Sequence, residues 1–216
     1  MRDAFHKELE RLDQEIVRMG ALVEQRTQMA TTALMEGDQA LAQKVRDGDQ
    51  DIDDVFMDIE KRSLALLAQQ APVAGDLRLV VAILGVINDL ERAGDLAYNI
   101  AKLAQGEDFR RPELKEVRLL VSELGQAASQ IMGTAIDAWA AKDERLAAGM
   151  EAQDDKIDDL HARLLEKLVD LKGQDSLGPA LRLALVGRYF ERIGDHAVNL
   201  GERLRYFVTG DEEHLG

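Results

Sequence analysis

Two copies of one acidic segment carry the residues of this chain that could do chemistry. The segments Leu90–Ile100 and Phe190–Leu200 align without a gap, 100 residues apart, and share six identical positions. Side chains four and eight residues apart lie along one ridge of a helix. Each copy therefore predicts a row of oxygen-bearing side chains: Glu91, Asp95 and Asn99 in the first, and Glu191, Asp195 and Asn199 in the second. Two acids at this spacing repel by roughly 0.2–0.5 kcal/mol, a cost that a bound cation would offset.

A second set of acids precedes each copy. Asp49 and Asp53 form one pair four residues apart, and Asp154 and Asp158 repeat it 105 residues later. Asp49 and Asp154 stand where the helical pattern calls for an apolar side chain, and a carboxylate at a helix interface is costly without a partner. If the helices pack antiparallel, the two pairs of each half meet and place four carboxylates around one site. Such an oxygen-only set suits Mg²⁺, Ca²⁺, Mn²⁺ or iron better than copper or a structural zinc.

Two other interpretations of the acids stay open. The acids could be a solvated surface, because Arg92, Arg188 and Arg192 each stand three residues before an acid and could form ordinary ion pairs. A carboxylate-bridged hydrolase or oxidase is disfavoured, because Gly94 and Gly194 occupy the positions where di-iron bundles carry histidine. The sequence also contains no phosphate-binding loop and no nucleophile motif. We therefore expect no enzymatic activity, and we expect the two glycines to let helices approach closely.

The elements that would position these acids are six long helices. Apolar residues recur every three or four positions over stretches of roughly 30 residues, each about 45 Å long as a helix. Gly37 is expected to end the first helix, and Asp38, Asp76 and Asp143 are expected to cap the second, third and fifth. A turn is expected over residues 173–179. Short connections make sequential helices antiparallel neighbours.

The second half of the chain repeats the plan of the first. Residues 106–112 have turn residues, mixed charge and no periodicity, which marks a boundary. We expect an all-α protein of two tandem three-helix bundles, six long antiparallel helices related by internal duplication. The first bundle would cover residues 1–108 and the second residues 109–216.

Composition excludes several classes of function. The 216 residues carry a formal net charge of −14, which argues against nucleic-acid binding because that needs a basic face. The same charge would be repelled by an anionic membrane, so membrane association would go through a protein partner. The sequence contains no cysteine and no apolar run long enough to span a bilayer, and we expect no signal segment because residues 1–10 carry charges of both signs. We expect a soluble cytoplasmic protein.

The motifs resemble those of the PhoU family of bacterial phosphate-transport regulators. The resemblance rests on Gly75-Asp76-Leu77-Arg78 and on the segments Asn88–Ile100 and Phe190–Asn199, and it spans essentially the whole chain. It implies a cytoplasmic accessory protein, peripheral to the inner membrane through its partners, that restrains phosphate uptake and silences phosphate-starvation genes. The implied partners are the ATPase subunit of the phosphate ABC transporter and the phosphate-sensing histidine kinase, and a homodimer is implied.

The resemblance also implies a divalent or multinuclear metal, namely Mg, Mn, Fe or Zn. Carried over by position, the metal residues would be Asp49, Asp53, Glu91 and Asp95 in the first half, and Asp154, Asp158, Glu191 and Asp195 in the second. The second half departs from the pattern, because residues 178–182 read Gly-Pro-Ala-Leu-Arg in place of the Gly-Asp-Leu-Arg opening. The competing hypothesis is a metal-independent helical scaffold.

Overall fold

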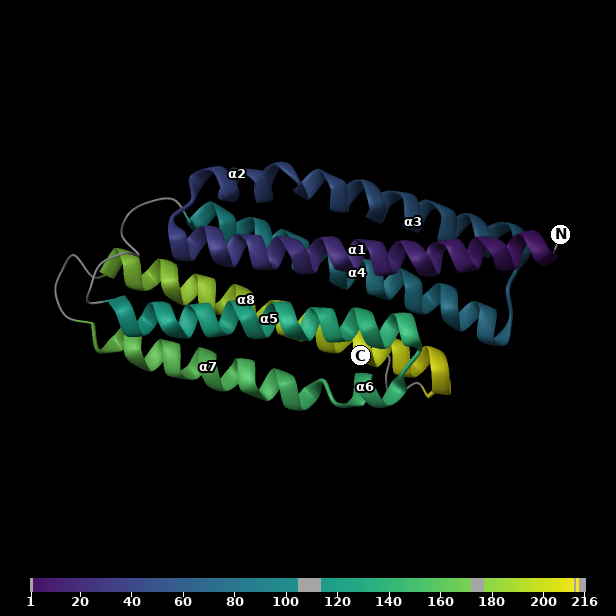
Figure 1. The fold of residues 1–216 in the computed structure, drawn as a ribbon. Coiled ribbons are helices and arrows are strands. Elements are labelled where there is room, and N and C mark those ends of the chain that lie inside the picture. The colour runs from purple at the N-terminus through teal and green to yellow at the C-terminus, as the bar shows by residue number, and fades with distance from the viewer. Residues whose placement is uncertain (1, 105–113, 172–176, 212, 214–216) are drawn as a thin grey trace.

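The computed structural model is a bundle of helices that run along one long axis (Figure 1). It describes residues 2–104, 114–171, 177–211 and 213, and these residues contain no β-strand. The helices in these ranges are α1 (Arg2–Glu36), α2 (Gln39–Asp47), α3 (Asp49–Gln70), α4 (Ala74–Leu103), α5 (Lys115–Ala141), α6 (Glu144–Ala148), α7 (Glu151–Val169) and α8 (Leu177–Thr209). The predicted all-α class is confirmed. Of these helices, none has a stretch long and apolar enough to cross a bilayer.

The two halves of the chain lie side by side. Helices α1 to α4 form one layer and α5 to α8 the other, and α1 and α4 pack against α5 and α8 between them (Figure 1). The segments α2–α3 and α6–α7 lie on opposite outer sides. The predicted tandem three-helix sets are therefore present, and they share one continuous apolar core. The expected boundary at 106–112, and with it the division between residues 108 and 109, lies outside the described residues.

Local signals in the sequence set most helix positions. The apolar face of the first helix, from Phe5 to Val23, is buried as expected. Gly37 ends α1 with a φ of 64°, a conformation that glycine adopts at little cost. The side chain of Asp38 accepts a hydrogen bond from the Leu41 amide at 2.9 Å, and Asp143 likewise caps α6. Both predicted caps are confirmed.

The predicted second and fifth helices are each broken once. The breaks fall at Gly48, between α2 and α3, and at Gly149, between α6 and α7. At the first break a β-carbon on Gly48 would come within 2.1 Å of the Arg26 guanidinium, so a side chain from α1 occupies the space beside the glycine. As a result Asp49 begins α3 and Asp154 lies in the first turn of α7. The positive end of a helix dipole favours negative charge at such positions.

Two expected helix starts differ from the prediction. Helix α4 begins at Ala74, after Val73, so Asp76 lies in its first turn and does not cap it. Helix α8 begins at Leu177, so Pro179 belongs to its first turn, where a missing amide hydrogen costs nothing. Residues 172–176 of the expected turn lie outside the described residues.

Candidate metal centres

The first candidate centre lies between α3 and α4, which pack against each other. Asp49 and Asp53 come from α3, and Glu91 and Asp95 come from α4, and all four are partly buried. Burial, together with the charges of Asp53, Asp95 and Glu91, raises the pKa of Asp49 to about 6. Burial and Asp95 also raise the pKa of Glu91. The structure therefore brings the four predicted carboxylates of this half into one mutually repelling group.

The second candidate centre repeats this arrangement between α7 and α8. Burial and the charges of Asp195, Asp158 and Glu191 raise the pKa of Asp154 to about 6. Burial, followed by Asp195, raises the pKa of Glu191. Within the described part of the chain, the buried Asp154 Oδ1 and Glu191 Oε2 have no hydrogen-bond partner. Unpaired buried carboxylate oxygens are unfavourable, so a cation that contacts these two oxygens would stabilise the centre.

A glycine on the facing helix lets each acid pair approach. A β-carbon on Gly194 would lie 2.4 Å from Asp154 Oδ1, and one on Gly94 would lie 3.1 Å from Ile52 Cδ1. The expectation that these glycines permit close helix approach is confirmed. In the second half the glycine makes room for the carboxylate itself.

Arginines already contact part of each acid set. Arg92 lies 3.5 Å from Glu91 and 3.7 Å from Asp95, and Arg188 donates a hydrogen bond to Glu191 Oε1. These contacts are the surface ion pairs that the scaffold hypothesis expects. As the side chains stand, no group of three or more Asp, Glu or His residues in the described ranges is placed to hold a metal ion. A metal would have to draw the carboxylates inward from these positions.

The donor set nevertheless suits a hard divalent cation. All the donors of the eight acids are oxygens, and two of those oxygens are buried without a partner. Carboxylates on facing helices are the ligands that Mg²⁺, Mn²⁺ or iron take. The residues present therefore fit such an ion.

The two centres differ in their surroundings. The buried Arg26 lies close enough to Asp49 to lower its pKa against the raising effects, and His196 acts in the same way on Glu91. The largest influences on Asp154 all raise its pKa. Asp49 thus has a basic residue among its main electrostatic neighbours and Asp154 has none, although the pKa of each is raised to about 6. In the second centre Arg188 and Arg192 act instead on Glu191, whose pKa they lower against the raising effects. The sequence prediction missed Arg26 because this residue lies on α1, outside the acid segments that were compared.

The predicted row of oxygens ends differently in the two halves. Asn199 donates its side-chain amide to Asp89 Oδ1 at 3.2 Å, across the α4–α8 interface. His196 Nδ1 lies 3.0 Å from the same oxygen, and Arg203 Nε donates to Asp89 Oδ2 at 2.7 Å. Asn99 is partly buried on α4. The role of the two asparagines as metal ligands stays a prediction.

Asp89 is a structural residue that the sequence prediction missed. Asp89 is only 6% exposed. Burial alone would raise the pKa of its carboxyl group, but the hydrogen bonds with His196 and Arg203 outweigh that effect and lower the pKa. The signal that could have found it is an acid inside the apolar run from Val80 to Leu90. Two of its partners on α8, His196 and Arg203, correspond to Leu96 and Leu103 in the first half, so the duplication gave no indication of this contact.

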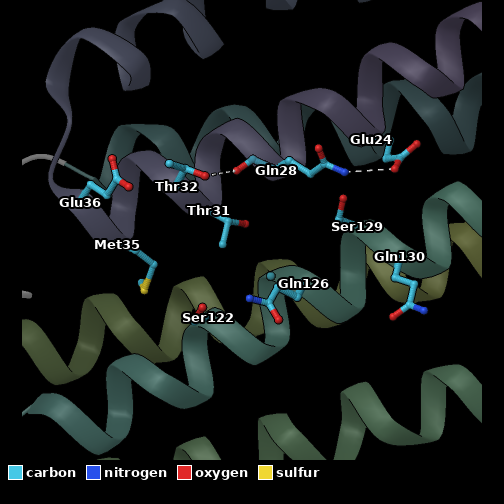
Figure 2. A pocket seen from close by; sticks show the side chains of 11 residues that line it. Glu24, Gln28, Thr31, Thr32, Met35, Glu36, Ser122, Gln126, Ser129 and Gln130 are labelled. Carbon is cyan, nitrogen blue, oxygen red and sulfur yellow. Dashed lines mark hydrogen bonds between the residues drawn. The ribbon is translucent and has the colours of Figure 1, made fainter.

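A separate groove of about 610 Å³ lies between α1 and α5 (Figure 2). Most of its lining side chains carry hydroxyl or carboxamide groups, with Glu24, Met35 and Glu36 among them, and none of the predicted metal residues lines it. Gln28 donates to Glu24 at 3.1 Å, and Thr32 donates to the Gln28 carbonyl at 3.0 Å. This groove has no cluster of charges comparable with the two acid centres.

The chain and its fold match a known family. A family model described as the PhoU domain matches residues 16–104 and 121–204, which together cover most of the chain. The chain belongs to the PhoU family. All ten predicted site residues fall inside the two matched ranges.

PhoU proteins resemble the chain along nearly their whole length. The PhoU homolog 2 of Mycobacterium tuberculosis, a phosphate-specific transport system accessory protein, is 33% identical over 210 residues, covering 97% of this chain and 99% of its own. A PhoU homolog from Pseudomonas putida with the same description is 37% identical, over 98% of this chain and 84% of its own.

Solved PhoU structures share the fold. The crystal structure of PhoU from Pseudomonas aeruginosa superposes with a TM-score of 0.90 at 32% identity, over 96% of this chain and 100% of the other. PhoU from Streptococcus pneumoniae, a phosphate transport system regulatory protein, superposes with a TM-score of 0.86 at 27% identity, over 96% and 98%. The predicted family is confirmed.

Proposed function

We propose that this protein is a cytoplasmic, metal-binding accessory regulator of phosphate transport. The regulatory part of the proposal is supported by PhoU relatives of nearly equal length whose descriptions are phosphate-specific transport system accessory proteins. A regulator needs no catalytic centre, and the sequence carries no phosphate-binding loop and no nucleophile motif. The protein would act as an adaptor without enzymatic activity.

The metal-binding part rests on one observation, the buried and unpartnered Oδ1 of Asp154. Burial and the neighbouring acids of the same half raise the pKa of Asp49 and of Asp154, so a divalent cation would remove a repulsion that the metal-free fold must bear. When bound, the ion supplies positive charge between two helices of each half. The residues that would hold it are Asp49, Asp53, Glu91 and Asp95 in the first half, Asp154, Asp158, Glu191 and Asp195 in the second, with Asn99 and Asn199 as further oxygen donors.

The proposed partners follow from the family resemblance. They are the ATPase subunit of the phosphate ABC transporter and the phosphate-sensing histidine kinase, whose activities the adaptor restrains, and the protein itself would form a homodimer. Bound metal would tighten α3 against α4 and α7 against α8, because it neutralises the repulsion between the acids that face each other there. The change would alter the helix faces that a partner meets.

Thermal unfolding with and without Mn²⁺ tests the metal proposal. A ligand that binds only the folded state raises the melting temperature by mass action. We expect the wild type to gain several degrees at millimolar Mn²⁺, and we expect Asp154→Asn/Glu191→Gln to gain much less. The matched control is Asp159→Asn/Glu166→Gln, which removes the same charge from exposed positions on α7. It should respond like the wild type.

The scaffold hypothesis predicts a different outcome. The hydrogen bond from Arg188 to Glu191 favours it, because an arginine already neutralises one oxygen there. If Mn²⁺, Mg²⁺ and Fe²⁺ each leave the melting temperature of the wild type unchanged, the acids are a solvated surface and the metal proposal fails.

A further inference from the structure

The interface between α7 and α8 contains a histidine that the two acid sets leave unused. His161 lies on α7 three residues after Asp158, so the two side chains share one face of that helix. The Nε2 atom of His161 is buried and has no hydrogen-bond partner among the described residues. A histidine that serves only to stabilise a core normally has such a partner, because an unpaired buried ring nitrogen is costly. Hydrogen bonding within the fold therefore does not explain this side chain.

A glycine on α8 makes room for the histidine ring. A β-carbon on Gly187 would lie 2.6 Å from Leu164 Cδ2 and 3.1 Å from His161 Cδ2. The two helices run in opposite directions (Figure 1). Gly187 lies one turn before Glu191 on α8, and His161 lies one turn after Asp158 on α7. The ring is therefore next to the second candidate centre, one helical turn from an acid on each helix.

Three buried atoms without partners belong to this interface. They are Asp154 Oδ1, Glu191 Oε2 and His161 Nε2, and each of them can offer a lone pair to a cation. In the described part of the chain, no such atom belongs to the four acids of the first centre. The second centre thus combines two oxygens and a nitrogen that the contacts within the protein leave unused.

The first half of the chain has no counterpart of this histidine. At the 105-residue offset that relates the two aspartate pairs, His161 corresponds to Phe56. At the 100-residue offset that relates α4 to α8, Gly187 corresponds to Ile87. Ile87 belongs to the core and Phe56 packs against it. An apolar pair in one half is therefore replaced by a histidine and a glycine in the other, and only the second half gains a possible metal ligand.

The imidazole is held in the form that binds metal ions. Burial and the positive charge of Arg188 lower the pKa of His161 against the opposing charge of Asp158, so the ring is neutral at neutral pH. Only a neutral imidazole can coordinate a metal ion. Imidazole suits iron, nickel and zinc, whereas sites made of carboxylates alone suit Mg²⁺, Ca²⁺ and Mn²⁺.

We propose that His161 is a metal ligand of the second centre, where its nitrogen joins the carboxylates and makes the site favour iron or zinc over Mg²⁺. The inference rests on the metal binding proposed above. The first centre has oxygen donors only and keeps the preference for hard ions, so the two halves of one chain select ions of different classes. Like the carboxylates, the imidazole would move inward to contact the ion.

Pulsed electron paramagnetic resonance of bound Mn²⁺ tests this assignment. A coordinated imidazole nitrogen modulates the Mn²⁺ signal, and carboxylate oxygens do not. The full chain carries Asp49→Asn/Asp53→Asn, so that the second centre is the intact one. We expect a nitrogen modulation that His161→Phe removes, since this variant restores the side chain of the first half. The matched control is His6→Phe on α1, where His6 lies 3.7 Å from Asp76 and outside both centres; it should keep the modulation.

Calorimetry in the same background measures the change in metal preference. We expect His161→Phe to weaken Zn²⁺ binding about 10-fold or more, because even a residue that only supports a ligand is typically worth that much. Mg²⁺ binding should stay within about two-fold, because Mg²⁺ gains little from a nitrogen ligand. Melting curves in EDTA check that the variant folds, and His161→Leu replaces it if it does not.

The possible failures separate this inference from the proposed function. If Mn²⁺ binds without a nitrogen modulation, or the modulation survives the loss of His161, the assignment is overturned and the carboxylate centre stands. Equal losses of Zn²⁺ and Mg²⁺ affinity would also overturn it, because they would show that the ring only supports the fold. If the protein binds no Mn²⁺ at all, the metal-binding function and this inference fail together.

Discussion

Asp154 on α7 lies directly against Gly194 on α8, so closely that a β-carbon on the glycine would come within 2.4 Å of the aspartate Oδ1. That oxygen is buried and has no hydrogen-bond partner among the described residues. The sequence therefore accepts a glycine inside a helix, at a cost of about 1 kcal/mol relative to alanine, and holds a carboxylate beside it. An apolar side chain at position 154 would satisfy the packing, so the carboxylate is better explained by a bound cation than by stability.

Gly194→Ala should damage the second centre selectively. The new methyl group displaces the Asp154 carboxylate, and we expect the affinity for Mn²⁺ at this centre to fall at least 10-fold. Gly94→Ala is the matched variant, because its methyl group would meet Ile52 Cδ1 at 3.1 Å and no carboxylate. Isothermal titration calorimetry with Mn²⁺ compares the two. Equal losses, or none in Gly194→Ala, would contradict the assignment.

Removing the acids should stabilise the metal-free protein. The pKa values of Asp49 and Asp154 are raised from 3.8 to about 6 in the folded state, so folding costs free energy above that pH. In EDTA at pH 7.5 we expect Asp49→Asn/Asp154→Asn to melt about 2–4 °C above the wild type, which corresponds to about 1 kcal/mol for a chain of this size.

The pH dependence of that difference follows from the same shifts. The folded state binds these protons more tightly than the unfolded state, so their stabilising effect is complete below about pH 3.8 and is lost as the pH rises through 6. The advantage of the variant should therefore shrink steadily from pH 7 to pH 4.5. Melting curves over this range check the sign, and an advantage that grows on acidification would refute it.

The two centres should bind metal with unequal affinity. Arg26 offsets part of the negative potential at Asp49. At Asp154 the main influences on the pKa are burial and neighbouring acids, and all of them raise it. We expect Mn²⁺ to fill the second centre first, with a dissociation constant roughly 5- to 10-fold lower. In a titration followed by electron paramagnetic resonance, Asp154→Asn should remove the tighter step and Asp49→Asn the weaker one.

Asp89 should be a strong determinant of stability. Asp89→Ala leaves Arg203 and His196 without their acceptor at the α4–α8 interface, and we expect a loss of about 3 kcal/mol. The neighbouring Asn88→Ala changes an exposed side chain and should cost less than about 0.5 kcal/mol. Urea denaturation measures both. A loss below 1 kcal/mol for Asp89→Ala would show that α8 does not depend on this contact.

Local patterns in the sequence predicted most of the fold. Helical periodicity indicated which face of each helix is buried, and Asp38 and Asp143 cap their helices because capping depends on only a few neighbouring residues. The breaks at Gly48 and Gly149 were not predicted, since the apolar pattern continues through both. At Gly48 the decisive contact is Arg26 of α1, a tertiary neighbour that no local pattern indicates.

For the candidate site too, the sequence predicted the local features and missed the tertiary contacts. Spacing and duplication placed the eight acids on facing helices, because two residues four apart on a helix share a face wherever the helix lies. Contacts between the two halves could not be predicted in this way. The hydrogen bonds of His196, Asn199 and Arg203 with Asp89 join residues more than 100 positions apart, and the duplication does not repeat them. The asymmetry between the two centres was missed for the same reason.

The most direct test of the account is a crystal grown in Mn²⁺ and measured at a wavelength where manganese scatters anomalously. We predict anomalous peaks between α7 and α8 and between α3 and α4, with oxygens of Asp154, Glu191 and Asp195 at the 2.0–2.6 Å distances typical of hard divalent cations. The account is contradicted if the map shows no peak at either place and the carboxylates contact only water and the side chains of Arg92 and Arg188.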